Sequence, residues 1–139
     1  MKLPRIVIYS DNLPNGIDGD ALMFIVRIRN QYRNDHGILA HEDEHVKQWY
    51  TCFAAGIITS FMLWVLAYSM WPITLVLGVG AHSIMYSLVD RYRLWSEVAA
   101  YRVQANYFAD DRRELFASFI ASRYRLSISA SDAEVMLRN

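Results

Sequence analysis

The hydrophobic residues near the N-terminus fall into two short groups separated by a polar segment. Residues 5–9 are mostly apolar and β-branched, and residues 22–29 end in an alternation of apolar residues with arginine. Such alternation is typical of a half-exposed strand. The intervening residues 10–20 carry Pro, Gly, Asp and Asn at several positions, which predicts a loop. We therefore predict two short strands, paired as an edge ribbon.

Helical spacing dominates the rest of the chain. It predicts a helix over about 38–50 or beyond, and a long amphipathic helix over about 90–125, with a break near 109–111 as the alternative. Residues 131–134 have the spacing of a capping box that opens a short last helix. A chain of 139 residues suits one hydrophobic core. We expect an α+β fold, mostly α, with residues 1–139 forming a single domain.

A long uncharged block separates the two outer parts of the chain. Residues 48–89 contain no Asp, Glu, Lys or Arg, a run of 42 residues. The block divides at Trp71-Pro72. Its first half, about 20 residues over 51–70, is long enough to cross roughly 30 Å of hydrocarbon as a helix. Its second half, over 73–89, contains His82 and is marginal as a span. Residues 51–89 are therefore predicted to form an apolar helical hairpin.

An HExxH sequence precedes this block, at His41-Glu42-Asp43-Glu44-His45. On a helix the two histidines share one face, so both imidazoles can bind one zinc ion. Glu42 lies about 100° around the helix, where it can accept a proton from a water at the open coordination position. The alternative is a polar helix face with two solvated histidines. Apolar neighbours on both sides of the motif argue for a partly buried helix, in which histidines need a partner.

A catalytic zinc site also needs a third protein ligand. Cys52 could donate a thiolate, although Cys is not the usual partner of HExxH; His82 and Glu97 are better candidates. A carboxylate on the apolar side of the predicted helix is costly unless it is paired or bound to a metal. The alternative for Glu97 is an ion pair with Arg93 or Arg102.

The sequence around these residues resembles a known family. Residues 37–49 are similar to the active-site helix of compact gluzincin zinc metallopeptidases, most closely the short ones encoded in bacteriophage genomes. Residues 91–102 resemble the second helix of that family, which provides the glutamate ligand. The resemblance implies a zincin-like domain in which His41, His45 and Glu97 bind zinc and Glu42 is the general base. It also implies that residues 22–29 form the edge strand that pairs with an extended peptide substrate.

The chain departs from the family pattern at two places. Larger gluzincins often have Asp four residues after the glutamate ligand, where this chain has Tyr101, which could support a ligand from the same helix face. A long uncharged segment separates the two similar blocks. His82 and Tyr86 lie near the second block and could stabilise an oxyanion, as a His or Tyr does in this family. The alternatives are a hydrogen-bonded histidine in an apolar environment and a core tyrosine.

The zinc hypothesis constrains the uncharged block. A membrane hairpin returns the chain to the side that it left, so the three ligands stay together, whereas a single span would separate them. Two buried helices of a soluble cytoplasmic protein are the other interpretation, and these require an oligomer. Lys47, Arg91 and Arg93 flank the hairpin, which by the positive-inside rule predicts a membrane-associated protein with its zinc site on the cytoplasmic face.

The leading hypothesis is thus a membrane-associated zinc metallopeptidase acting on a peptide or protein substrate. The alternatives are a non-catalytic small membrane protein, such as a lysis factor, with a structural or degenerate HExxH, and a zinc hydrolase with another substrate. Equal numbers of basic and acidic residues, fourteen each, argue against a nucleic-acid partner. The single Cys52 excludes an internal disulfide. Arg112-Arg113 and Arg123 to Arg125 are expected on a solvated helix face, with contact to anionic lipid as the alternative.

Overall fold

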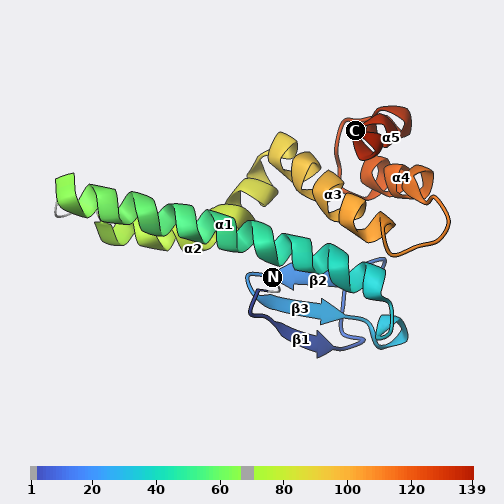
Figure 1. Cartoon of the computed structure of the whole chain (residues 1–139), viewed down its shortest axis with the longest axis horizontal. Coiled ribbons are helices and arrows are strands. Elements are labelled where there is room, and N and C mark those ends of the chain that lie inside the picture. The colour runs from blue at the N-terminus through green and yellow to red at the C-terminus, as the bar shows by residue number, and fades with distance from the viewer. Residues whose placement is uncertain (1–2, 67–70) are drawn as a thin grey trace.

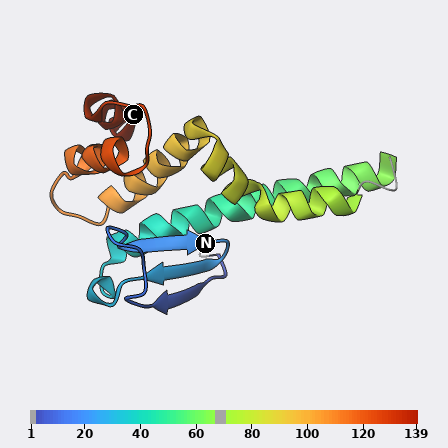
Figure 2. The ribbon, with the colours of Figure 1, turned by 180° about the vertical axis from the view of Figure 1, so that it is seen from behind.

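The computed structural model describes residues 3–66 and 71–139, and it confirms a mostly helical α+β fold (Figure 1). Its elements in chain order are β1 (Ile6–Tyr9), β2 (Gly19–Leu22), β3 (Ile25–Ile28), a 3-10 turn (Asn30–Tyr32), α1 (His36–Leu66), α2 (Trp71–Leu88), α3 (Asp90–Ala105), α4 (Arg113–Arg123) and α5 (Ala130–Arg138). The sheet and the three C-terminal helices lie on opposite sides of α1, as the view from behind also shows (Figure 2).

The sheet has the strand order β1-β3-β2, which corrects two expectations. Residues 22–29 are not one strand, because the chain turns at Met23-Phe24 and β3 pairs antiparallel with β2. They are not the edge strand either: β3 is central and also pairs in parallel with β1, while β2 lies at the edge. Burial of Val26 and Ile28 against α1 places β3 in the middle. Met23 has a φ of +58°, a left-handed turn conformation that a methionine does not predict.

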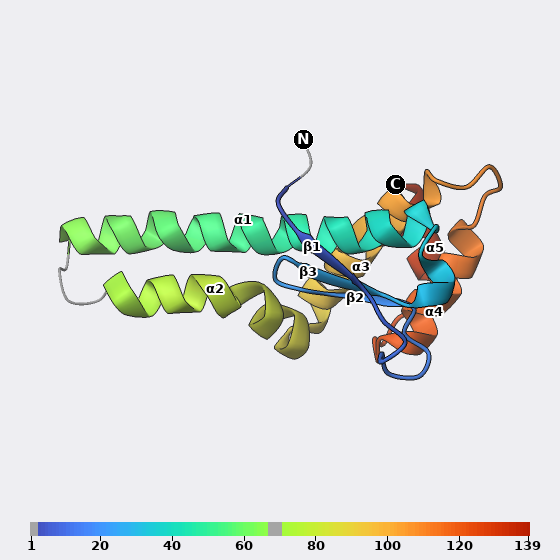
Figure 3. The same ribbon diagram turned by 90° about the horizontal axis from the view of Figure 1, so that it is seen from below.

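Helix α1 is continuous over 31 residues, so the HExxH motif and the first arm of the predicted hairpin belong to one helix of about 46 Å. Helix α2 runs back beside it, and the two project together from the body of the molecule (Figure 3). Trp71-Pro72, where the sequence predicts the bend of the hairpin, lies in the first helical turn of α2. Residues 67–70, which connect α1 to α2, are outside the described residues.

The two arms of the hairpin touch closely. A Cβ atom added to Gly56 would lie 2.4 Å from the Cα of Gly78, so glycine is required for this approach. Thr74 donates a hydrogen bond to Ser60 across the pair at 2.8 Å, and Ser60 in turn donates to the Gly56 carbonyl at 2.7 Å. Close contact of small residues with a shared hydroxyl bond is typical of helix pairs in membranes.

Helix α1 is long and apolar enough to span a membrane. Only 11% of its most apolar window of 18 residues is buried, so this part of α1 is not covered by the rest of the described chain. The outer part of α2 is similarly exposed, with Val76 at 70% and Leu77 at 54%.

The long amphipathic helix expected over 90–125 is two helices. Helix α3 leaves α2 with a 99° bend at Val89 and ends at Ala105, and α4 begins at Arg113. The break falls where the alternative placed it, because the side chain of Asp111 accepts a hydrogen bond from the backbone of Arg113 and competes with helical bonding. The N-cap of α5 is Ser129 rather than Ser131, and Ser129 accepts from the backbone of Asp132 at 3.1 Å.

Candidate metal centre

Two packed elements bring the HExxH motif and Glu97 together. One side of α1 packs on the sheet through Val46, and α3 crosses its other side. As a result His41 and His45 on α1 and Glu97 on α3 are all buried, with Glu97 only 1% exposed. The His41 and His45 Nε2 atoms are 3.2 Å apart, and they lie 3.4 and 3.5 Å from the two carboxylate oxygens of Glu97.

The separation of the two imidazole nitrogens suits a tetrahedral metal ion, and each nitrogen has a different Glu97 oxygen at a similar distance. Two ligand atoms that each lie 2.0–2.1 Å from zinc at a tetrahedral angle are about 3.3–3.4 Å apart. The described residues leave Oε2 of Glu97 and Nδ1 of His41 without a hydrogen-bond partner, although both atoms are buried. A buried carboxylate oxygen without a partner is costly, and a cation would remove that cost. The donor set, two imidazoles and one carboxylate, therefore fits zinc.

The arginines predicted as alternative partners of Glu97, and the alternative ligand Cys52, make other contacts. Arg93 pairs with Asp90, and Arg102 donates to the carbonyl of Met136, so the ion-pair alternatives for Glu97 are wrong. The thiol of Cys52 lies 3.5 Å from the hydroxyl of Tyr92 and outside the ligand cluster.

A buried hydrogen-bond network orients His45. Its Nδ1 lies 3.0 Å from Oε1 of Gln48 and 3.1 Å from Oγ of Ser96, and Gln48 Nε2 donates to the Ser96 carbonyl at 3.2 Å. Ser96 Oγ itself donates to Gln48 Oε1, so the proton between these groups and the ring sits on Nδ1. The lone pair of Nε2 is then free to face Glu97, as a metal-binding histidine requires.

Two tyrosines support the remaining ligands. The Tyr86 hydroxyl donates to Oε1 of Glu97. The ring of Tyr101 packs edge-on against His41 at 4.4 Å, and its hydroxyl bonds to that of Tyr124 at 2.9 Å. Tyr101 thus contacts the candidate ligand His41 through its ring.

The charges of the cluster are those that a metal site needs. Burial would raise the pKa of Glu97, but the facing imidazoles of His41 and His45 lower it to about 2, so the carboxylate is ionised. Burial acts to lower the pKa of His41, but contact with Glu97 outweighs it and raises the pKa; burial and the nearby His41 lower the pKa of His45. The ionised carboxylate of Glu97 and the neutral imidazole favoured at His45 are the forms in which these groups bind a metal.

Glu42 lies in the same cavity as the three candidate ligands. Strand β2 passes directly beside it: a Cβ atom on Gly19 would come within 3.1 Å of Glu42 Oε1, so a larger residue would crowd the carboxylate. Burial raises the pKa of Glu42 to about 8. A carboxyl group with a pKa near neutrality is suited to accepting and returning protons.

His82 and Tyr86, both on α2, line this cavity as well. The rings of His82 and Tyr86 lie 6.3 and 6.0 Å from that of His45. Nδ1 of His82 is bonded to the Tyr92 hydroxyl at 2.8 Å. The fold therefore brings both predicted oxyanion residues to the cluster, although the hydroxyl of Tyr86 is engaged by Glu97.

Sequence reasoning missed three supporting residues, Gln48, Ser96 and Tyr92. Gln48 follows His45 by three residues and so shares its helix face, a signal that could have identified it. Ser96 and Tyr92 act through tertiary contacts between α1, α2 and α3, for which the sequence spacing carries no signal.

No protein-family model, curated protein or solved structure matches this chain.

Proposed function

We propose that this chain is a zinc-dependent metallopeptidase that is anchored in a membrane by the α1–α2 hairpin. The observation that carries the proposal is the buried cluster of His41, His45 and Glu97, in which the two Nε2 atoms are 3.2 Å apart, each has a different Glu97 oxygen 3.4 or 3.5 Å away, and Glu42 lies in the same cavity. His41, His45 and Glu97 hold the ion, which when bound acts as a Lewis acid toward water and the substrate carbonyl.

Glu42 performs the proton transfer. Its carboxylate accepts a proton from the attacking water and passes it to the amine that leaves when the peptide bond breaks. Burial beside the cluster keeps this group close to its working pKa. His82 and Tyr86 face the same cavity, where they stabilise the negative charge on the substrate oxygen, Tyr86 once its hydroxyl is released from Glu97.

The substrate is an extended peptide that pairs with β2. In the three-stranded sheet of the described residues, β2 is the edge strand beside α1, and all four of its residues, Gly19–Leu22, line the cavity. An unpaired strand edge binds an extended chain through main-chain hydrogen bonds. This edge favours a peptide substrate over other substrates of a zinc hydrolase.

The membrane anchor rests on exposed apolar surface. In the outer part of the hairpin, ten apolar side chains are each at least 44% exposed: Ile57, Ile58, Phe61, Met62, Trp64, Val65 and Leu66 on α1, and Ile73, Val76 and Leu77 on α2. Lys47, Arg91 and Arg93 lie where the hairpin joins the body, which supports a cytoplasmic position for the metal site.

A non-catalytic membrane protein with a degenerate motif is the alternative function. A large distance between Glu97 and the two histidines would favour that alternative. The distances of 3.4 and 3.5 Å favour the metal site.

Metal analysis tests the proposal. Detergent-purified protein, prepared without chelator, is expected to contain one zinc per chain by mass spectrometry, and Glu97→Ala is expected to lose most of it because a tetrahedral site keeps only two protein ligands. Glu134→Ala is the matched control, since Glu134 lies on α5 and pairs with Arg138. Absence of zinc from the wild-type protein would contradict the proposal.

Gln48→Ala is expected to weaken zinc binding by about 10–100-fold, because partners that orient a ligating histidine typically contribute that much. Lys47→Ala is the control, as Lys47 is adjacent but 63% exposed and paired with Glu44. Competition with a chelating indicator measures the affinities, and a thermal melt of each zinc-free variant checks folding. Equal affinities of both variants and the wild type would remove Gln48 from the site.

A further inference from the structure

The cavity that holds the metal cluster is larger than the cluster needs. Its volume is about 590 Å³, and it continues past Tyr101 and Gln104 to the face of α4. Ligand cavities of this size hold a sizeable group, with apolar walls and a few polar groups that fix its orientation. The part of the cavity beyond Tyr101 has no role in the proposed proton transfer or metal binding.

The far wall is apolar and aromatic. It is formed by Phe108 from the α3–α4 connection and by Leu115, Phe116 and Phe119 on α4. Phe116 is buried and stacks on Tyr101 at 5.0 Å, which fixes the wall to α3. Leu115 is 46% exposed, so it presents apolar surface that the described chain does not cover.

A guanidinium group lies at each end of this wall. The Cζ of Arg112 lies 3.9 Å from the centre of the Phe108 ring, and the Cζ of Arg123 lies 3.8 Å from that of Phe119. Both arginines line the cavity, and Arg112 also pairs with Asp110 at 2.9 Å in an exposed ion pair. Asp18 on the β1–β2 loop reaches Arg123 at 3.9 Å across the cavity. Both side chains are partly exposed, and a weak pair of this kind can be replaced by a carboxylate of a ligand.

We propose that this wall, defined by Phe108, Leu115, Phe116 and Phe119, is a subsite for a large apolar side chain of the substrate, with Arg112 and Arg123 favouring acidic residues beside it. The inference rests on the proposed peptidase function and names its substrate class. A peptide on the edge of β2 sends every second side chain to the face of the sheet on which α1 lies. Such a side chain can enter the cavity, which is lined by residues of both β2 and α4.

Peptide binding to the Glu42→Gln protein tests the subsite without turnover. The probes are fluorescein-labelled decapeptides with a central Phe or Ala, flanked by Asp or by Lys. The Phe peptide with Asp flanks is expected to bind at least about tenfold more tightly than its Ala counterpart, because an apolar pocket discriminates by roughly this factor or more. Lys flanks are expected to weaken binding of the Phe peptide.

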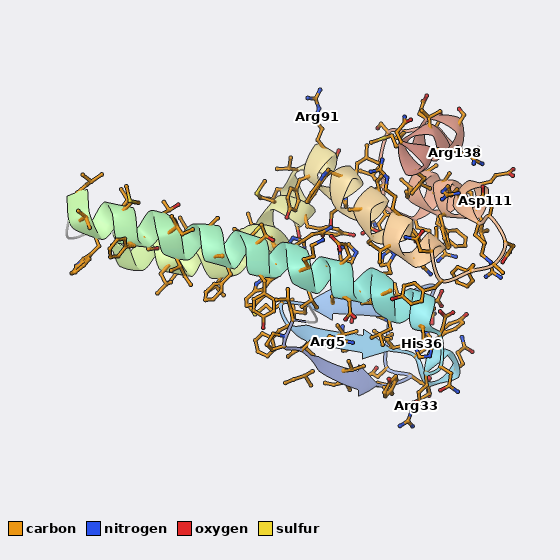
Figure 4. All side chains as sticks on the ribbon, viewed as in Figure 1. Arg5, Arg33, His36, Arg91, Asp111 and Arg138 are labelled. Carbon is orange, nitrogen blue, oxygen red and sulfur yellow. The ribbon has the colours of Figure 1, made fainter. Side chains whose placement is uncertain are left out.

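Matched variants assign the effect to the wall. Leu115→Ala is expected to reduce the preference for Phe over Ala, whereas Val135→Ala, at a 58% exposed position on α5, leaves it unchanged. Arg123→Gln is expected to reduce the preference for Asp flanks, whereas Arg91→Gln does not, since Arg91 points away from the body (Figure 4).

The outcomes separate this inference from the peptidase proposal. Equal binding of Phe and Ala peptides, or no binding of any probe, would overturn the subsite even if the protein carries zinc. A Phe preference that Leu115→Ala abolishes would support the subsite, and zinc analysis of the same samples decides the metal site separately.

Discussion

Glu42→Gln is expected to abolish peptide cleavage and to leave zinc bound. Glutamine has nearly the same shape as glutamate but cannot accept the proton of the attacking water, and loss of a general base typically costs 10²- to 10⁴-fold in rate. Glu42 is absent from the set of three ligand side chains, so the metal content should stay at one zinc per chain. Cleavage of a peptide mixture by the zinc-loaded proteins, followed by mass spectrometry of the products, measures the effect.

Glu44→Gln provides the matched control on the same helix. Its carboxylate is two residues from Glu42 but bonds to Lys47 at 2.9 Å, so the variant should cleave like the wild type. Cleavage by Glu42→Gln at the wild-type rate would contradict the assigned role. Loss of both zinc and activity would instead make Glu42 a structural residue.

The cluster of candidate metal ligands was predictable because the information for it is largely local. His41 and His45 are one helical turn apart, so their spacing alone places them on one face. Glu97 is the better candidate for a third ligand because a carboxylate on an apolar helix face needs a partner, and the Glu97 side chain is only 1% exposed. The network of Gln48 and Ser96 depends on how α3 crosses α1, which the sequence does not specify.

The errors in the fold have physical causes as well. Met23 and Phe24 are apolar and continue the hydrophobic run, so the sequence predicts one strand over residues 22–29. In the structure, Met23 and Phe24 form the turn between β2 and β3. The edge strand on the side of the cavity is consequently Gly19–Leu22, whose glycine and aspartate residues are more typical of loops. A strand this short depends on pairing with β3 rather than on its own propensity.

A double variant in which arginine replaces both Ile58 and Val76 is expected to be released from membranes. The two side chains are 64% and 70% exposed near the middle of the two arms of the hairpin. Each arginine costs about 2.5–3.5 kcal/mol at the centre of a membrane helix, whereas the same change on a water-exposed surface costs almost nothing. The wild-type protein should stay with membranes after an alkaline carbonate wash, and the double variant should appear in the soluble fraction.

Val135→Arg is the control for this experiment, because Val135 is 58% exposed on α5, outside the hairpin. It should remain with the membrane. If the wild-type protein is instead soluble and oligomeric, and the double variant is monomeric, the hairpin is an interface between copies of the chain.

The distribution of apolar side chains favours the membrane over such an interface. Adjacent residues on a helix point about 100° apart, and both members of the pairs Ile57-Ile58, Phe61-Met62 and Val76-Leu77 are exposed. The apolar surface therefore extends around a wide arc of each arm, broader than the single stripe that a helix buries against one partner. Its polar groups at Ser60 and Thr74 are bonded to each other inside the pair. Lipid contacts such a surface on all of its outer sides, whereas a second copy would leave part of it in water.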